Sequence, residues 1–149
     1  MEITASVSAI LGQKGNTVWS ISPDATVFEA IQLMSQKNVG AIPVLKDGKL
    51  VGILSERDYT RKVVLVGRSS KQTVVKEIMS SNDVTAEPGD SVVECMRRMT
   101  VNKVRHLPVV ENGEMLGIIS IGDLVNFMIQ AQAATIEQLE NYVTGGTYQ

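Results

Sequence analysis

The sequence is poor in aromatic residues, which make up 4% of its 149 positions, and it contains one cysteine and one histidine. A single cysteine excludes a disulfide within the chain and disfavours a cysteine-based metal site. It also favours a reducing compartment. Hydrophobic residues still account for 44% of the sequence, so the core must consist of Val, Ile, Leu, Met and Ala.

The chain also lacks a large excess of charge of one sign, since its formal net charge is −2. No global basic field is therefore available to bind nucleic acid. No apolar stretch approaches the length of a membrane span. The first fifteen residues have neither the basic segment nor the apolar run of a signal peptide. We therefore expect a cytoplasmic protein that binds neither nucleic acid nor a membrane.

An internal repeat is the most informative feature that is present. The segment NVGAIPVLKDGKLVGILSERD, residues 38–58, matches KVRHLPVVENGEMLGIISIGD, residues 103–123, at an offset of 65 positions. The offset holds without a gap from Trp19 to Leu124 and keeps proline, glycine and acidic positions in register. Such a pattern predicts two copies of one structural unit.

The first helix of each unit is predicted from its cap. Thr26 with Glu29 and Ser91 with Glu94 have the spacing of a capping box. Apolar residues recur on one helical face behind each cap, and Cys95 lies on that face as a small core residue.

The rest of each unit follows from turn residues and apolar runs. Asp-Gly or Asn-Gly between two apolar runs predicts a tight hairpin. A short strand at 17–21 or 83–87 before the cap, and a second helix from near Ser55 or Ser120, complete the order β-α-β-β-α. We predict an α/β (α+β) fold of two such units related by a pseudo-twofold axis, because one unit alone has too little core. The predicted parts are an N-terminal lead-in helix at 1–16, repeat 1 at 17–66, a connector and lead-in helix at 67–81, repeat 2 at 82–129, and a C-terminal helix and tail at 130–149.

Both units resemble the cystathionine-β-synthase (CBS) domain, and together they resemble one CBS pair, or Bateman module. The resemblance rests on VGAIPVLKDGKLVGILSERD and VRHLPVVENGEMLGIISIGDL and extends over nearly the whole chain. The further segments ERDYTRKVVLVGRSSKQTVVKEIM and LENYVTGG resemble stand-alone CBS-pair proteins of bacteria and plant mitochondria. The resemblance implies a regulatory ligand such as AMP, ADP, ATP, S-adenosylmethionine or NAD, and no catalytic cofactor. It also implies a homodimer and a partner protein, such as a redox or metabolic enzyme.

The motif Gly-h-h-Ser-x-x-Asp, in which h is apolar, stands here as GILSERD and GIISIGD. In the family it binds ribose and phosphate. A helix N-terminus favours a phosphate, and the ionised Asp58 or Asp123 can accept hydrogen bonds from ribose hydroxyls. The same spacing also describes a plain helix cap, and the sequence leaves that interpretation open.

The resemblance implies two clefts, each built from the Ser/Asp turn of one unit and the pre-proline residues of the other. The first would contain Ile53, Ser55, Arg57, Asp58, Val84, Thr85, Val104, Arg105 and His106. The second would contain Trp19, Ser20, Val39, Gly40, Ala41, Ile118, Ser120 and Asp123. Arg57 and Arg105 lead us to expect the more highly charged ligand in the first cleft, because guanidinium groups suit phosphate.

Several assignments stay open at this stage. The sequence does not decide whether Arg105 or His106 points into the cleft, nor whether Trp19 is an adenine-stacking residue or a core or interface residue. No catalytic constellation, Walker A motif or Rossmann motif is present. We therefore predict a non-catalytic sensor with no metal site. The alternatives are a structural dimerisation module with unoccupied clefts, using an apolar edge at Ile136, Leu139 and Val143, or a nucleotide-processing enzyme.

Overall fold

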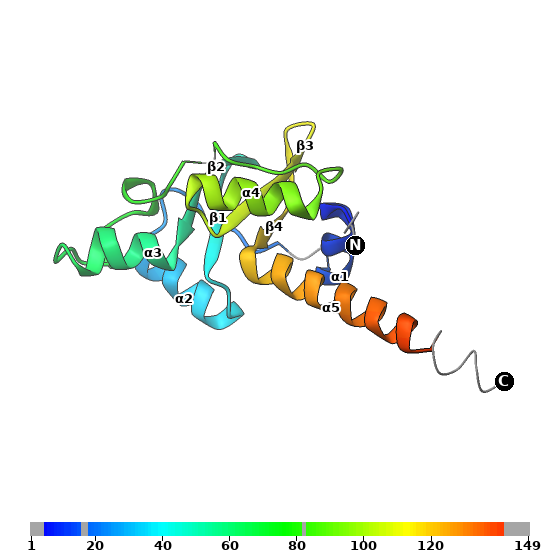
Figure 1. Cartoon of the computed structure of the whole chain (residues 1–149). Coiled ribbons are helices and arrows are strands. Elements are labelled where there is room, and N and C mark those ends of the chain that lie inside the picture. Colours follow the sequence, from blue (N-terminus) through cyan, green and yellow to red (C-terminus); the bar gives the residue numbers. More distant parts are fainter. Residues whose placement is uncertain (1–4, 16–17, 82, 142–149) are drawn as a thin grey trace.

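The structure is a computed structural model that describes residues 5–15, 18–81 and 83–141. Two units with the same elements follow one another in the chain, as predicted (Figure 1). The first unit contains α2 (Val27–Lys37), β1 (Ala41–Lys46), β2 (Lys49–Ser55) and α3 (Glu56–Tyr59), which a π-helical segment (Thr60–Val64) continues. The second contains α4 (Val92–Asn102), β3 (His106–Glu111), β4 (Glu114–Ser120) and α5 (Ile121–Glu140). α1 (Val7–Lys14) precedes both units, and a 3₁₀ turn (Val75–Glu77) lies between them.

Each unit has one antiparallel hairpin closed by a two-residue turn. Asp47 and Gly48 have φ angles of 52° and 78°, and Asn112 and Gly113 have 53° and 79°. Two consecutive positive φ angles define the turn that matches the twist of the flanking strands, and Asn, Asp and Gly tolerate them best. The predicted hairpins are therefore confirmed, with β2 of one unit facing β4 of the other.

The two predicted helix caps differ in detail. At the first, Thr26 Oγ1 accepts from the Glu29 backbone and the Glu29 carboxylate accepts from the Thr26 backbone, so the capping box is complete. At the second, Ser91 Oγ accepts from the Glu94 backbone at 3.0 Å. The Glu94 carboxylate turns instead to two guanidinium groups further along the helix. The second cap is thus confirmed, but its capping box is not, because arginine offers the carboxylate charged donors.

Three element predictions need correction. The segments 17–21 and 83–87 contribute single parallel bridges, Ile21 with Val44 and Ala86 with Val109, in place of strands, and Thr17 lies outside the described residues. The lead-in helix predicted within 67–81 is only the 3₁₀ turn. The predicted boundary at 129/130 falls inside α5, which is one continuous helix from the Ser120 turn; residues 142–149 are outside the described part of the chain.

Each unit has its own apolar core, and the lead-in segments complete these cores crosswise. Val7 and Ile10 of α1 are buried in the core of the second unit. Val75 and Ile78, which follow the connector, are buried in the core of the first. Backbone hydrogen bonds fix both arrangements, since Val75 N donates to Ala25 O at 2.8 Å and Val92 N to Ala5 O at 3.1 Å.

The crossed lead-ins lie close to the hairpins. Ser80 exchanges backbone hydrogen bonds with Ile53 of β2, at 2.8 and 3.0 Å. A Cβ at Gly52 would lie 2.9 Å from Ser80 O, and a Cβ at Gly117 would lie 3.0 Å from Leu11 Cδ2. Both glycines therefore serve the approach of a lead-in segment. The same approach brings the end of each lead-in to a Ser/Asp turn.

Candidate functional site

The Ser55–Asp58 turn is a complete capping box at the start of α3. Asp58 N donates to Ser55 Oγ at 3.1 Å, and the Asp58 carboxylate accepts from Ser55 N and Ser55 Oγ at 3.0 Å each. Glu56 N donates to Gly40 O at 3.0 Å. The cap interpretation is therefore true of this turn. The backbone amides of Glu56 and Asp58 are not free to bind a phosphate, because both already have acceptors.

The second oxygen of Asp58 has partners from outside the cap. Asp58 Oδ1 accepts from Ser80 Oγ at 2.8 Å and lies 3.0 Å from Lys62 Nζ. Only 8% of the Asp58 side chain is exposed. Such hydrogen-bonding and charged partners offset the cost of burying a carboxylate. A ribose that hydrogen-bonds to Asp58 would have to take the place of Ser80 or Lys62.

A cleft of about 610 Å³ lies beside this turn, between the two units. Eight of the nine residues predicted for the first cleft line it: Ile53, Ser55, Arg57, Asp58, Val84, Val104, Arg105 and His106. Gly40, which was predicted for the second cleft, also lines it, as do residues that the prediction missed: Glu56, Ser80, Ser81, Asp83, Asn102 and Lys103. The cleft is thus built crosswise, from β2 and α3 on one side and the end of α4 and the start of β3 on the other.

The ninth residue, Thr85, does not line this cleft. Its carbonyl accepts from Arg98 Nη1 at 3.0 Å, and it faces a separate shallow hollow that Asp90 also lines. Arg98 fixes the backbone at Thr85 beside this hollow, because its guanidinium also forms an ion pair with Asp90 at 2.6 Å. Val84 lines both hollows.

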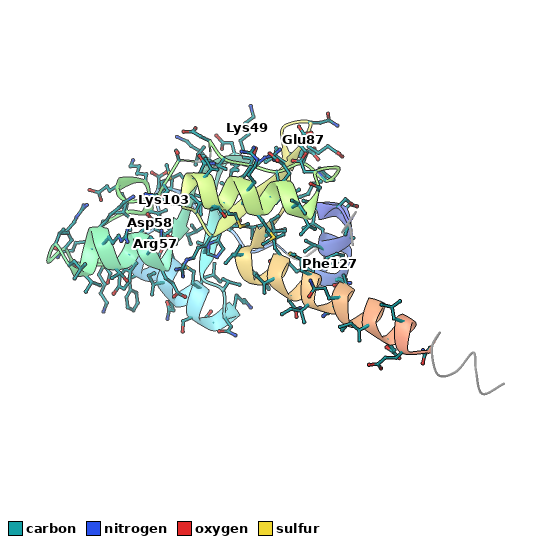
Figure 2. The ribbon with its side chains drawn as sticks, viewed as in Figure 1. Lys49, Arg57, Asp58, Glu87, Lys103 and Phe127 are labelled. Carbon is teal, nitrogen blue, oxygen red and sulfur yellow. The ribbon has the colours of Figure 1, made fainter. Side chains whose placement is uncertain are left out.

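Three positively charged residues line the cleft: Arg57, Lys103 and Arg105. Arg57 Nη1 donates to Lys103 O at 3.3 Å, which draws the start of α3 to the end of α4. Figure 2 shows Arg57, Asp58 and Lys103 together at this junction. Arg105 lines the same cleft. Lys103 adopts a left-handed conformation, with a φ angle of 55°, as the C-cap of α4. The carboxylates of Glu56 and Asp83 also line the cleft.

His106 lies at the centre of the interface between the units. It begins β3 opposite Ser120 and is half-buried, and a Cβ at Gly40 would lie 3.6 Å from its Nε2 atom. Burial lowers the pKa of His106, and the nearby charge of Lys14 and Arg105 lowers it further, while Asp123 opposes them. Arg105 is exposed, and both residues line the first cleft.

The second Ser/Asp turn has a charged occupant. Ser120 N donates to Asp123 Oδ2 and Asp123 N donates to Ser120 Oγ, at 2.8 and 3.0 Å. Lys14 Nζ then donates to Asp123 Oδ2 and to Ile118 O, both at 2.7 Å. Burial acts to raise the pKa of Asp123, but hydrogen bonds from Lys14 and Ser120 outweigh it, and the pKa lies below its usual value.

The other residues predicted for the second cleft have mixed positions. Trp19 is 41% exposed, so it is not a core residue. Lys37 Nζ lies over its ring, 4.0 Å from the centroid. Ser20 is exposed, Val39 packs against the first core, and Ala41 is buried in β1. Gly40 lines the first cleft instead.

The prediction missed Lys14 and Ser80, which lie outside the 65-position register of the repeat. The lead-in residues in equivalent places, Leu11 beside Gly117 and Met79 beside Gly52, are 68 positions apart. Each lead-in brings a polar side chain to a Ser/Asp turn, Lys14 in one case and Ser80 in the other. Among the described residues, no group of three or more His, Cys, Asp or Glu side chains is arranged to hold a metal ion. No described helix is long and apolar enough to cross a membrane.

Comparison with known proteins agrees with this architecture. The sequence profile of the CBS domain matches residues 16–65 and 75–130. The chain is 37% identical to the mitochondrial CBS domain-containing protein CBSX3 of Arabidopsis thaliana over 96% of this chain and 74% of that protein. It is also 37% identical to the CBS domain-containing protein YhcV of Bacillus subtilis, over 87% of this chain and 92% of that protein. A crystal structure of the CBS domain protein NE2398 superposes with a TM-score of 0.80 at 46% identity, covering 84% and 98% of the two chains. The chain belongs to the CBS domain family, which is known for regulatory ligand binding.

Proposed function

We propose that this protein is a non-catalytic regulatory module that binds an adenosine-containing ligand in its first cleft and transmits occupancy to a partner protein. AMP, ADP, ATP, NAD and S-adenosylmethionine are the candidate ligands. One observation carries the proposal: the crosswise cleft of about 610 Å³ is lined both by hydroxyl and carboxylate groups, from Ser55, Asp58 and Ser80, and by three cations, Arg57, Lys103 and Arg105. Small-molecule sites typically have volumes of roughly 300–1,000 Å³.

The two kinds of side chain that line the cleft suit the sugar and the phosphate of a nucleotide. Ser55, Asp58 and Ser80 provide the exchangeable hydrogen-bond partners that a ribose needs. The phosphate would bind the side chains of Arg57, Lys103 and Arg105. Side-chain cations take this role because Glu56 N already donates to Gly40 O and Asp58 N to Ser55 Oγ.

Signalling follows from the position of the cleft. Because its walls come from both units, a ligand that prefers one relative position of the units shifts their equilibrium. Part of the proposal is that the chain works as a homodimer. Ile136 and Leu139 of α5, which are 55% and 56% exposed, support this; Val143 lies outside the described residues.

The phosphate contact is tested by isothermal titration of AMP and adenosine into the wild type and Arg105→Ala. We expect AMP to bind at least about ten-fold more weakly to the variant, because a hydrogen bond to a charged group contributes roughly 1.5–3 kcal/mol. Adenosine should bind both proteins equally, since it has no phosphate. Arg97→Ala, which removes an exposed arginine outside the cleft, is the matched control.

Unchanged AMP affinity in Arg105→Ala would contradict the phosphate assignment. Absence of binding of every adenosine compound by the wild type would favour the alternative, a structural module with unoccupied clefts. Nucleotide released from the purified protein by acid and detected by ultraviolet absorbance tests the same point without added ligand. Hydrolysis of ATP or NAD that a cleft substitution abolishes would favour an enzyme.

A further inference from the structure

The lysine at the second Ser/Asp turn comes from a distant part of the sequence. Lys14 is the last residue of α1, which Val7 and Ile10 anchor in the core of the second unit. Its ammonium reaches Asp123, 109 positions away, and Ile118, 104 positions away. The contact is therefore a product of the crossed lead-in, and its two distances of 2.7 Å are typical of charge-assisted hydrogen bonds.

The two acceptors that Lys14 uses are those that a ligand at this turn would need. A nucleoside at this turn would donate hydrogen bonds from its hydroxyl or amino groups to the Asp123 carboxylate and the Ile118 carbonyl, which are acceptors only. Lys14 Nζ donates to both acceptors at once and also neutralises Asp123. A neutral hydroxyl that replaces the ammonium removes this neutralisation from a partly buried carboxylate.

The first Ser/Asp turn receives a different kind of side chain from its lead-in segment. There the lead-in segment brings the hydroxyl of Ser80 to Asp58 Oδ1 at 2.8 Å, and the charged partner, Lys62, belongs to the same helical segment as the turn. An incoming hydroxyl can replace Ser80 without a change of charge. The two turns have the same motif, but the lead-ins give them a neutral partner in one case and a cationic partner in the other.

We propose that Lys14 is an intramolecular occupant of the second Ser/Asp turn, which a ligand must displace before it can bind there. This inference rests on the proposed function. Lys14 thereby determines the order of filling: the first cleft binds its ligand directly, and the second turn binds only when the end of α1 is released. Because α1 completes the core of the second unit, occupancy of the second turn would be coupled to the N-terminal lead-in.

The test is titration of AMP and adenosine into the wild type and Lys14→Met, which keeps most of the side-chain length and removes the charge. We expect one strong site in the wild type and two in the variant, with the second site tightened by about ten-fold or more. Lys76→Met, which loses a lysine from an exposed pair with Asp24, should behave as the wild type does. An unchanged number of sites, or weaker AMP binding in Lys14→Met, would overturn the proposal. Weaker binding would make Lys14 a phosphate ligand.

A second measurement tests the contact without nucleotide. Acetylation by an N-hydroxysuccinimide ester, followed by mass spectrometry, should modify Lys14 several-fold faster in Asp123→Asn than in the wild type, with Lys76 as the internal reference. Equal rates would refute the occupancy of the turn. If Lys14 is protected but neither the wild type nor Lys14→Met binds AMP or adenosine, the contact stands, whereas the proposed function and the competition both fail.

Discussion

The second lead-in segment approaches β2 closely at Met79 and Ser80, which makes Gly52→Ala a test of the crossed arrangement of the lead-ins. A Cβ at this position would lie 2.6 Å from Met79 Sδ and 2.9 Å from Ser80 O. The Met79 side chain can rotate away, but Ser80 O is held by the Ile53 amide at 3.0 Å. The added methyl group must therefore push the backbone of the lead-in segment at Ser80 away from β2.

The expected cost combines three effects. Overpacking of a close contact costs about 1–3 kcal/mol. Displacement of Ser80 also weakens its hydrogen bond to the buried Asp58 carboxylate, a bond of a kind that contributes about 1.5–3 kcal/mol. In the opposite direction, alanine reduces the conformational entropy of the unfolded chain, which stabilises the folded protein by roughly 0.4–1 kcal/mol. We expect a net loss of about 2 kcal/mol for Gly52→Ala, which for a chain of this size corresponds to a fall in Tm of about 4–8 °C.

The pseudosymmetric position provides the matched control. A Cβ at Gly117 meets only Leu11 Cδ2, the end of a flexible side chain, at 3.0 Å. Gly117→Ala should therefore lose less than about 1 kcal/mol. Urea unfolding followed by circular dichroism measures both variants. Equal losses in the two variants, or a Gly52→Ala protein within about 0.5 kcal/mol of the wild type, would refute the reasoning.

Two further predictions concern His106 and the crossed cores. Because the folded chain lowers the pKa of His106, its contribution to stability is complete above its ordinary pKa of 6.5 and is lost as the pH falls towards the lower folded value. His106→Asn should remove this part of the pH dependence of the free energy of unfolding; an unchanged slope between pH 7 and about 5 would contradict the assignment. Ile10→Ala and Ile78→Ala should each cost about 2–5 kcal/mol and speed amide hydrogen exchange in different hairpins, β3–β4 for Ile10 and β1–β2 for Ile78. Faster exchange of the same hairpin in both variants would exclude the crossed arrangement.

Most of the local structure was predictable because its causes lie within a few residues. Asp47 and Gly48 take the two positive φ angles that the hairpin turn needs, whatever surrounds them. Thr26 caps its helix with a side chain that reaches three residues ahead. The segments 17–21 and 83–87 failed as strands because each forms a single bridge at the edge of a hairpin, which their composition does not reveal.

Eight of the nine residues of the first predicted cleft line one hollow, because the in-register repeat and the family resemblance together indicate which segments face each other. Ligand binding by these residues stays a prediction. Thr85 was misplaced because the hydrogen bond from Arg98 holds its carbonyl outside the cleft, and no local pattern announces that bond.

The sequence by itself determined the duplicated unit, its hairpin turns and the two Ser/Asp caps, since these depend on short-range sterics and hydrogen bonding. Only the tertiary structure decided that each lead-in completes the core of the unit that it does not directly precede. The apolar patterns of the two lead-ins are similar, so packing rather than pattern selects the partner. That choice brings Ser80 to Asp58 and Lys14 to Asp123, and it makes two identical motifs chemically different.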